Sequence, residues 1–292
     1  FINPQTSTKE SLDSIVDYIT EVMNTITPVG LTIPQKFFDE DLITIYPIAD
    51  AHMGMKAHIA EAGENYDLDT AALRVKCGIS KCIKGSPSSN KAIILDVGDI
   101  THSDDGNYVT PRSKHPLDMS SSHYEAIDCA ILTLCSCIEL AADHHKKVLV
   151  RILRGNHNEH SYIAIMFALF ERYRDNPNII IEKTPSDFFV YTFGSNMFAA
   201  HHGDKAKAER LVMHMAHQWS EEWGRTKWRY YFTGHLHHAK LQDIGGVQVE
   251  QLRAVSSRDS YASSHGYVGA PQMQAITYHR RDGESSRVKV SF

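Results

Sequence analysis

Five apolar, strand-like runs of this 292-residue chain each end in Asp, Asn or His, and this feature most constrains what the chain can fold into. The run ends read IADAH, DVGD, RGNH, AAHHGD and TGHLH, in this order along the sequence. In α/β sheets ligands bind outside the carboxyl ends of the strands, so such ends converge at one edge. We therefore expect the apolar runs to form buried strands and their polar ends to form a single site.

The segments between these runs predict the fold class. Apolar residues recur with helical spacing at 68–83, 120–145 and 160–175, and strand-like runs cover 42–50, 91–99 and 146–156. Strands that alternate with helices predict a sheet with helices on its outer face. The second half is mostly strand-like, with one helix-like interruption, so we expect a second, more meander-like sheet. DIGGV and RRDGES predict hairpin turns within it.

The N-terminal segment differs in character from the remainder. Ser7 and Glu10 fit a capping box, and apolar residues at three- and four-residue steps follow them as far as Ile26. A stretch rich in Pro and Gly comes next. We expect residues 1–38 to be an N-terminal helix with a lead-in, and residues 39–292 to be a single domain.

Composition excludes several classes of protein. A net charge of -5 and a pI near 6.4 argue against a broadly basic nucleic-acid coat, although a local basic groove remains compatible with them. The sequence shows neither an apolar run of membrane-spanning length nor a secretory signal. The five cysteines favour reduced, mostly buried thiols. We expect a cytoplasmic protein that does not contact membranes, and the outlying residue type is histidine, with 18 copies.

The run ends offer carboxylate, imidazole and amide donors, which suit Mn²⁺, Fe, Zn²⁺ or Co²⁺. The donors are too many for one ion and suffice for two, and paired ions need a bridging carboxylate. Asp50/His52 and His235/His237 have i, i+2 spacing. Along an extended strand alternate side chains point the same way, so each pair is expected to offer two ligands.

The motifs, taken in order, resemble those of the calcineurin-like metallophosphoesterase family. The family pattern is D-x-H, G-D, G-N-H-[DE], H-G and G-H-x-H, and its counterparts here run from residue 50 to residue 237. The resemblance implies an α/β fold, a four-layer α-β-β-α sandwich with two mostly mixed sheets and the metal site at the C-terminal ends of the strands. A two-metal phosphodiesterase that acts on DNA or RNA would be similar to the repair-exonuclease branch of the family.

The resemblance also implies a role for each motif residue. It places one metal on Asp50, His52 and His237, the other on Asn156, His202 and His235, and Asp99 between them. His157 would act on the phosphate, as general acid to the leaving oxygen or as a charge stabiliser, and a metal-bridging hydroxide would be the nucleophile. Two divalent ions are implied. Mn²⁺ is the first expectation, and Fe, Zn²⁺, Co²⁺ or Ni²⁺ are alternatives.

Two positions depart from the family pattern or blur it. Asn158 stands where the family has Asp or Glu directly after the catalytic histidine, and Glu159 follows it. The carboxylate often orients the histidine, so the group that orients His157 is an open question. In AAHHGD two histidines compete. We expect His202 to be the ligand because it directly precedes Gly, with His201 on the opposite side of the strand.

The substrate is not determined by the motifs, because the walls of such a site select it. We expect hydrolysis of a phosphodiester, with single- or double-stranded DNA or RNA as substrate. The alternatives are a phosphomonoesterase acting on a nucleotide or phosphoprotein, and a non-catalytic scaffold. His102, Arg258 and Tyr261 are candidate substrate contacts. The basic and aromatic stretch 221–232 either tracks a nucleic acid or forms a helix end that leads into a buried strand. The oligomeric state is left open.

Overall fold

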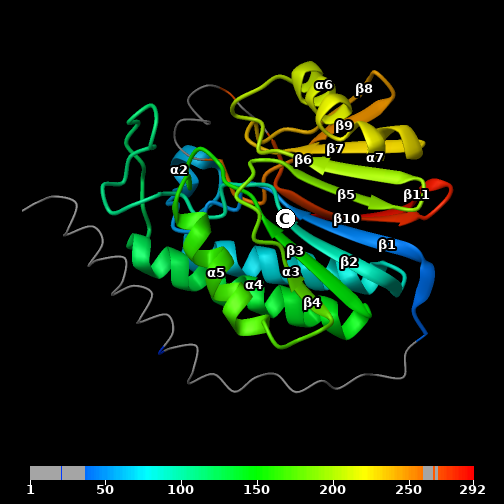
Figure 1. Cartoon of the computed structure of the whole chain (residues 1–292). Coiled ribbons are helices and arrows are strands. Elements are labelled where there is room, and N and C mark those ends of the chain that lie inside the picture. Colours follow the sequence, from blue (N-terminus) through cyan, green and yellow to red (C-terminus); the bar gives the residue numbers. More distant parts are fainter. Residues whose placement is uncertain (1–20, 22–36, 259–265, 267–268) are drawn as a thin grey trace, which may run out of the picture.

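The computed structural model describes residue 21 and residues 37–258, 266 and 269–292. Most of the predicted segment 1–38 and the candidate substrate residue Tyr261 lie outside the described residues. The described elements stack as four layers, helix, sheet, sheet and helix, which confirms the predicted sandwich (Figure 1). Within these residues the structure contains no helix with the length and apolar character needed to cross a membrane.

The first sheet has six strands, in the order β11–β10–β1–β2–β3–β4. Their bounds are β1 (Asp39–Ile48), β2 (Ser89–Asp96), β3 (Lys147–Ile152), β4 (Ile179–Ile181), β10 (Gln272–His279) and β11 (Gly283–Ser291). Strands β1 to β4 are parallel, whereas β10 and β11 are antiparallel additions beside β1. The outer face carries α3 (Leu68–Gly85), α4 (His123–His144) and α5 (Ser161–Tyr173), and the short α2 (Ile59–Ala62) precedes α3.

The second sheet has five strands, in the order β5–β6–β7–β9–β8. They are β5 (Phe189–Phe193), β6 (Asn196–Ala200), β7 (Trp228–Thr233), β8 (Lys240–Ile244) and β9 (Val247–Gln251), and α6 (Ala208–Gln218) and α7 (Ser220–Arg225) accompany them. The meander-like expectation is wrong here, because β6, β7 and β9 are parallel neighbours. The two predicted hairpin turns are confirmed, between β8 and β9 and between β10 and β11.

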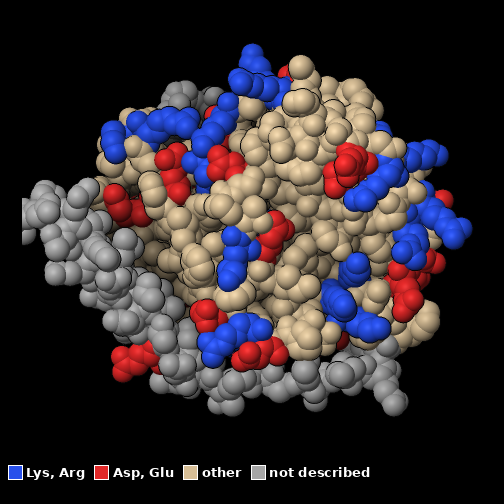
Figure 2. All heavy atoms as spheres, in the orientation of Figure 1, with Lys and Arg blue, Asp and Glu red and all other residues tan. Residues whose placement is uncertain are grey.

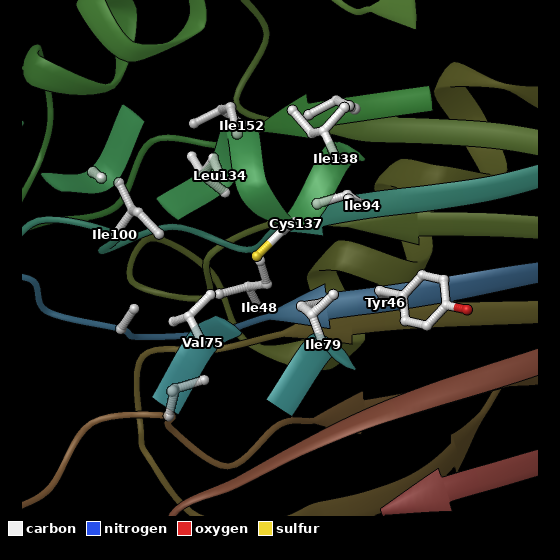
Figure 3. Packing of buried hydrophobic residues seen from close by; sticks show 14 of the residues in the cluster. Tyr46, Ile48, Val75, Ile79, Ile94, Ile100, Leu134, Cys137, Ile138 and Ile152 are labelled. Atoms are coloured by element: carbon white, nitrogen blue, oxygen red, sulfur yellow. The ribbon is translucent and has the colours of Figure 1, made fainter. Parts of the chain in front are cut away.

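Three apolar clusters fill the three gaps between the four layers. Alternate residues of β1 divide between two of them: Tyr46 and Ile48 pack toward the helices, and Ile43 and Ile45 pack toward the second sheet. Figure 3 shows the helix-side cluster, in which side chains of β1, β2 and β3 meet those of α3 and α4. Both faces of these strands are covered, and this explains why the sequence reads as continuous apolar runs.

Helix starts follow local sequence signals. The side chain of Asp67 caps α3 by accepting the backbone N–H of Thr70. Ser122 and Glu125 form a complete capping box at α4, which satisfies two of the backbone donors exposed at a helix start. These caps fix where each helix leaves the loop that precedes it.

A buried polar chain crosses the first sheet at the end away from the polar motifs. The ring of His145, 1% exposed, lies 2.7 Å from Tyr46 Oη and 2.9 Å from Ser89 Oγ. The chain continues from Ser89 through Thr44 to Thr277. Burial lowers the pKa of His145 from 6.5 to about 3. The neutral ring is therefore the form that the fold accepts.

This ring predicts a pH dependence of stability. The unfolded chain takes up the His145 proton near pH 6.5 and the folded chain near pH 3, so stability from this group is lost as pH falls below 6.5. Between pH 7.5 and pH 5 the free energy of unfolding should fall by about 2 kcal/mol from this residue. Urea unfolding of the native protein and of His145→Gln at both pH values measures this. Equal pH dependence in the two proteins would contradict the assignment.

Candidate metal centre

The polar ends of five strands meet at one edge of the sandwich. The ends of β1, β2 and β3 come from the first sheet, and those of β6 and β7 from the second. Two groups of donor atoms form there, each within 4.8 Å: one of Asp50, His52 and His237, the other of Asp99, His202 and His235. Each group combines residues from both sheets, so the site exists only where the sheets face each other.

The first group is built around the carboxylate of Asp50, which is fully buried. His237 Nε2 lies 3.5 Å from Asp50 Oδ1 and 3.2 Å from Nε2 of His52. The backbone N–H of His235 donates to Asp50 at 3.0 Å, which ties the β7 loop to the β1 loop. Two imidazole nitrogens and a carboxylate oxygen therefore point at a common space.

The second group is built around the ring of His202. Its Nε2 lies 3.0 Å from both Asp99 Oδ2 and Asn156 Oδ1, and its Nδ1 donates to the carbonyl of Val97 at 2.9 Å. Burial disfavours the charged ring, but the Asp99 carboxylate outweighs burial and raises the pKa of His202 to about 10. The ring of His235 lies 5.2 Å from that of His202.

Asp99 acts on both groups. Burial by itself would raise the pKa of this carboxyl, but nearby His202 and His157 hold it well below its usual range. His52 in the first group is fully buried, which lowers its pKa, and Asp99 partly opposes that effect. The remaining Asp99 oxygen, Oδ1, accepts the backbone N–H of His157 at 2.8 Å. One carboxylate thus links the two groups and the G-N-H loop.

The expected reason for the paired spacing is wrong, although the pairs do converge. Asp50, His52, Asp99, His235 and His237 all have left-handed backbone, with φ between 44° and 69°. These residues follow the strands and do not continue them. Left-handed backbone at residues other than glycine costs of order 1 kcal/mol or more each and persists where surrounding contacts enforce it. Tight turns, and not strand alternation, aim these side chains.

Three motif glycines make room for the carboxylates and rings. A Cβ at Gly155 would lie 1.9 Å from Asp99 Oδ1, and one at Gly234 would lie 2.6 Å from Asp50 Oδ2. A Cβ at Gly98, where φ is +99°, would lie 2.6 Å from the ring of His202. Each glycine of the G-D, G-N-H and G-H-x-H motifs is therefore required by a donor residue from another strand end.

Gly155→Ala should displace Asp99 and weaken divalent-metal binding by at least tenfold, because the added methyl group occupies the place of the carboxylate. Isothermal titration with Mn²⁺ measures this. Gly106→Ala is the matched control, since nothing lies within 4 Å of a Cβ there. Equal affinities in the two variants would show that Asp99 does not hold the metal.

The structure resolves which group orients His157. Its Nδ1 donates to the carbonyl of His102 at 2.8 Å, which leaves Nε2 for other partners. Asn158 instead accepts the backbone N–H groups of Gly155 at 2.6 Å and Asp99 at 3.2 Å. Glu159 pairs with Arg154 at 3.1 Å. A main-chain carbonyl thus takes the orienting position that the family gives to a carboxylate, and Asn158 shapes the loop.

His102, a candidate substrate contact, is only 2% exposed. Its Nδ1 lies 3.1 Å from Nδ1 of His52, and its ring stacks on that of His157 at 5.1 Å. His52, His102 and His157 form a third group of donors, which shares His52 with the first group and contains no carboxylate. His102 therefore lies beneath the site and holds the ring of His52.

The remaining predicted residues divide clearly. His201 packs against Phe188 at 4.9 Å and accepts the backbone N–H of Gly203, whereas His202 lies in the second donor group. Arg258 donates to the carbonyl of Ala62 at 3.0 Å and so holds its loop to α2. The basic and aromatic stretch 221–232 covers most of α7 and all but the last residue of β7, and Tyr230, Tyr231 and Phe232 are buried, so it is a helix end that leads into a buried strand.

Two acidic residues near the site, Asp104 and Asp96, were not predicted from the sequence. Asp104 caps α5 from a different loop: its Oδ1 accepts the N–H groups of His160 and Ser161 at 2.7 and 2.8 Å. Asp96 is fully buried beneath the site, and burial raises its pKa well above the usual value. The Asp in GDITHSDD was visible as a helix-cap residue type, but its partner helix lies 57 residues further on.

The donor set fits divalent metal ions. Two carboxylates, both nearly inaccessible, lie among imidazoles and an amide oxygen, and no structural zinc pattern of cysteines is present at these donor groups. Buried carboxylates without cations are costly, and two ions would offset that cost. Two divalent ions therefore suit the paired groups.

No protein-family model matches the chain, and no curated protein matches it. Solved structures with a similar arrangement include a dimetal phosphatase from Danio rerio, with 10% identity, a TM-score of 0.43 and coverage of 86% of this chain and 99% of that one. An archaeal phosphodiesterase is 13% identical, with a TM-score of 0.42 and coverage of 85% of this chain and 99% of that one. A predicted phosphoesterase from Streptococcus pneumoniae is 12% identical, with a TM-score of 0.36 and coverage of 86% of this chain and 98% of that one.

The order of the five motifs, the four-layer sandwich and the paired donor groups are independent features of one molecule. Motif order comes from the sequence, the layers from packing of three apolar clusters, and the groups from tight turns at the strand ends. The chain therefore combines motifs that resemble, in their order, those of the calcineurin-like metallophosphoesterases with a two-sheet α/β sandwich and paired groups of histidine and aspartate donors that could hold metal ions.

Proposed function

We propose that the chain is a metal-dependent phosphodiesterase that acts on nucleic acid in the cytoplasm. The paired donor groups around Asp99 are the observation that supports phosphoester hydrolysis. Asp50, His52 and His237 would hold one ion, and Asn156, His202 and His235 the other, with Asp99 shared. Divalent ions in such a pair lower the pKa of water and neutralise phosphate charge. Mn²⁺ is our first choice because mixed oxygen and nitrogen donors suit it.

Charge supports a diester over a monoester. A phosphomonoester carries nearly two negative charges at neutral pH, whereas a diester carries one. Arg154, which directly precedes the G-N-H motif, has a carboxylate on each of its three side-chain nitrogens. In the described part of the chain, the ion pairs of Asp50 and Asp99 are with histidines. The guanidinium of Arg154 is therefore already neutralised by carboxylates and does not offer its charge to a doubly charged terminal phosphate. This suits a singly charged diester.

A groove beside the donor groups supports a long anionic substrate. It has a volume of about 420 Å³ and lies against the loops that follow His202 and His235. Its walls include Lys205, Lys207 and Lys240 together with Asp204 and Glu209, and Lys205 also pairs with Asp187. Figure 2 shows that positive and negative side chains are interspersed on the face in view. Three lysines along one groove would offer contacts to successive phosphates of a chain.

His157 is the residue that we assign to the chemistry of the leaving group. The carbonyl of His102 holds the Nδ1 proton, so Nε2 is the atom that can face substrate. The ring packs edge-on against His52 at 4.7 Å, and its backbone N–H is fixed by Asp99. A proton held at Nε2 can pass to the leaving oxygen or stabilise its charge.

The substrate class is tested by Mn²⁺-supported hydrolysis of bis-p-nitrophenyl phosphate against p-nitrophenyl phosphate. We expect the diester to be preferred, and single-stranded DNA or RNA to be cleaved. Preference for the monoester would favour a phosphatase instead. Metal binding without hydrolysis of any ester would favour a non-catalytic scaffold.

The role of His157 is tested by His157→Ala. We expect a loss of kcat of about 100-fold or more, because a general acid contributes that much, with Mn²⁺ affinity within a few-fold of the native value. His160→Ala is the control, as its ring is largely exposed and pairs with Asp104. Full activity in His157→Ala would remove this residue from the mechanism.

A further inference from the structure

Arg154 connects three separate loops at the edge where the donor groups lie. Its Nη1 is 3.1 Å from Glu159, its Nε is 3.1 Å from Asp187, and its Nη2 is 3.0 Å from Asp204. Glu159 belongs to the G-N-H loop, Asp187 to the segment that leads into β5, and Asp204 to the loop after β6. One guanidinium therefore joins the first sheet to the second.

The arrangement is largely shielded from water. The side chain of Arg154 is 10% exposed and that of Asp204 is 3% exposed. A guanidinium is planar and offers its donors in fixed directions, so three partners define its position more tightly than one ammonium could. Lys205 adds a second cation on Asp187 at 2.9 Å, which keeps the carboxylates of the cluster compensated.

The ion pairs of Arg154 lie close in sequence to Asn156 and His202, two donors that would bind the same metal ion. Arg154 lies two residues before Asn156, and Asp204 lies two residues after His202. Asn156 Oδ1 and His202 Nε2 are 3.0 Å apart, although they come from different sheets. The Arg154–Asp204 ion pair is thus a direct connection between the two loops that must hold these atoms together.

We infer that Arg154 is a positioning residue: through Asp204 and Glu159 it fixes the separation of Asn156 and His202, and thereby the affinity of that half of the metal centre. The inference rests on the proposed two-metal function. It assigns Arg154 no contact with substrate, because each of its side-chain nitrogens already has a carboxylate partner. The loops that carry Asp50, His52 and His237 contribute no residue to this ion-pair cluster, whereas Arg154 and Glu159 lie on the loop of Asn156 and Asp204 lies on the loop of His202.

The test is the Arg154→Lys variant, titrated with Mn²⁺ in a calorimeter. Lysine keeps the positive charge but cannot place three separate nitrogens against the three carboxylates. Two binding events are expected in the native protein, and His237→Ala and His202→Ala reference proteins assign each event to its half. In Arg154→Lys, the event of the Asn156/His202 half should weaken 10- to 100-fold, as for other supports of metal ligands, and the other event should stay within threefold.

Arg287→Lys is the matched control, because Arg287 also pairs with two carboxylates, Glu250 and Glu284, but lies on β11. It should lower the melting temperature of the metal-free protein as much as Arg154→Lys and leave both binding events unchanged. Asp204→Asn should weaken the same half as Arg154→Lys, and the double variant should be no weaker than the weaker single variant. Asp204→Asn also carries the test if Arg154→Lys does not fold.

The outcomes separate this inference from the proposed function. A native protein that binds no Mn²⁺ overturns the two-metal proposal itself. Two native binding events that Arg154→Lys and Asp204→Asn leave unchanged overturn only the role of Arg154. Equal weakening of both events, or additive effects in the double variant, would make Arg154 a general stabilising residue and would also overturn the inference.

Discussion

The buried carboxylate of Asp99 is the interaction on which the site depends. It lies between sheets: it pairs with the ring of His202 from the second sheet and accepts the backbone N–H of His157 from the first. A charge with almost no exposure to water is stable only when its partners are fixed. The absence of a side chain at Gly155 and the turn at Gly98 are the conditions that allow it to sit there.

The site concentrates local strain that the surrounding packing must offset. Five predicted metal ligands have left-handed backbone, each unfavourable for a residue with a side chain. Around them, three apolar clusters hold the four layers together, and ion pairs and caps such as Arg154 and Asp104 join the loops. The rigid sandwich thus holds turns that short peptides of the same sequence would not adopt.

The helices and strands of the first half were predictable because their signals are local. The helical spacing through 120–145 corresponds to α4, and the apolar run at 42–50 corresponds closely to β1. The second sheet was predicted less well. Parallel pairing of β6, β7 and β9, and the return of β10 to the edge of the first sheet, depend on contacts between distant residues. Local sequence propensity cannot predict which distant strands pair with each other.

The sequence by itself determined which residue types stand at the strand ends, and the order of the motifs was enough to predict the donor residues that cluster as Asp50, His52 and His237 and as Asp99, His202 and His235. Only the tertiary structure decided how they are aimed, by left-handed turns in place of extended strands, and that the carbonyl of His102 orients His157. It also decided that Asn158 shapes the loop and that Arg154 joins the sheets. The physical reason is that residue type limits what a side chain can bind, whereas its direction and its partners are set by packing between segments far apart in the chain.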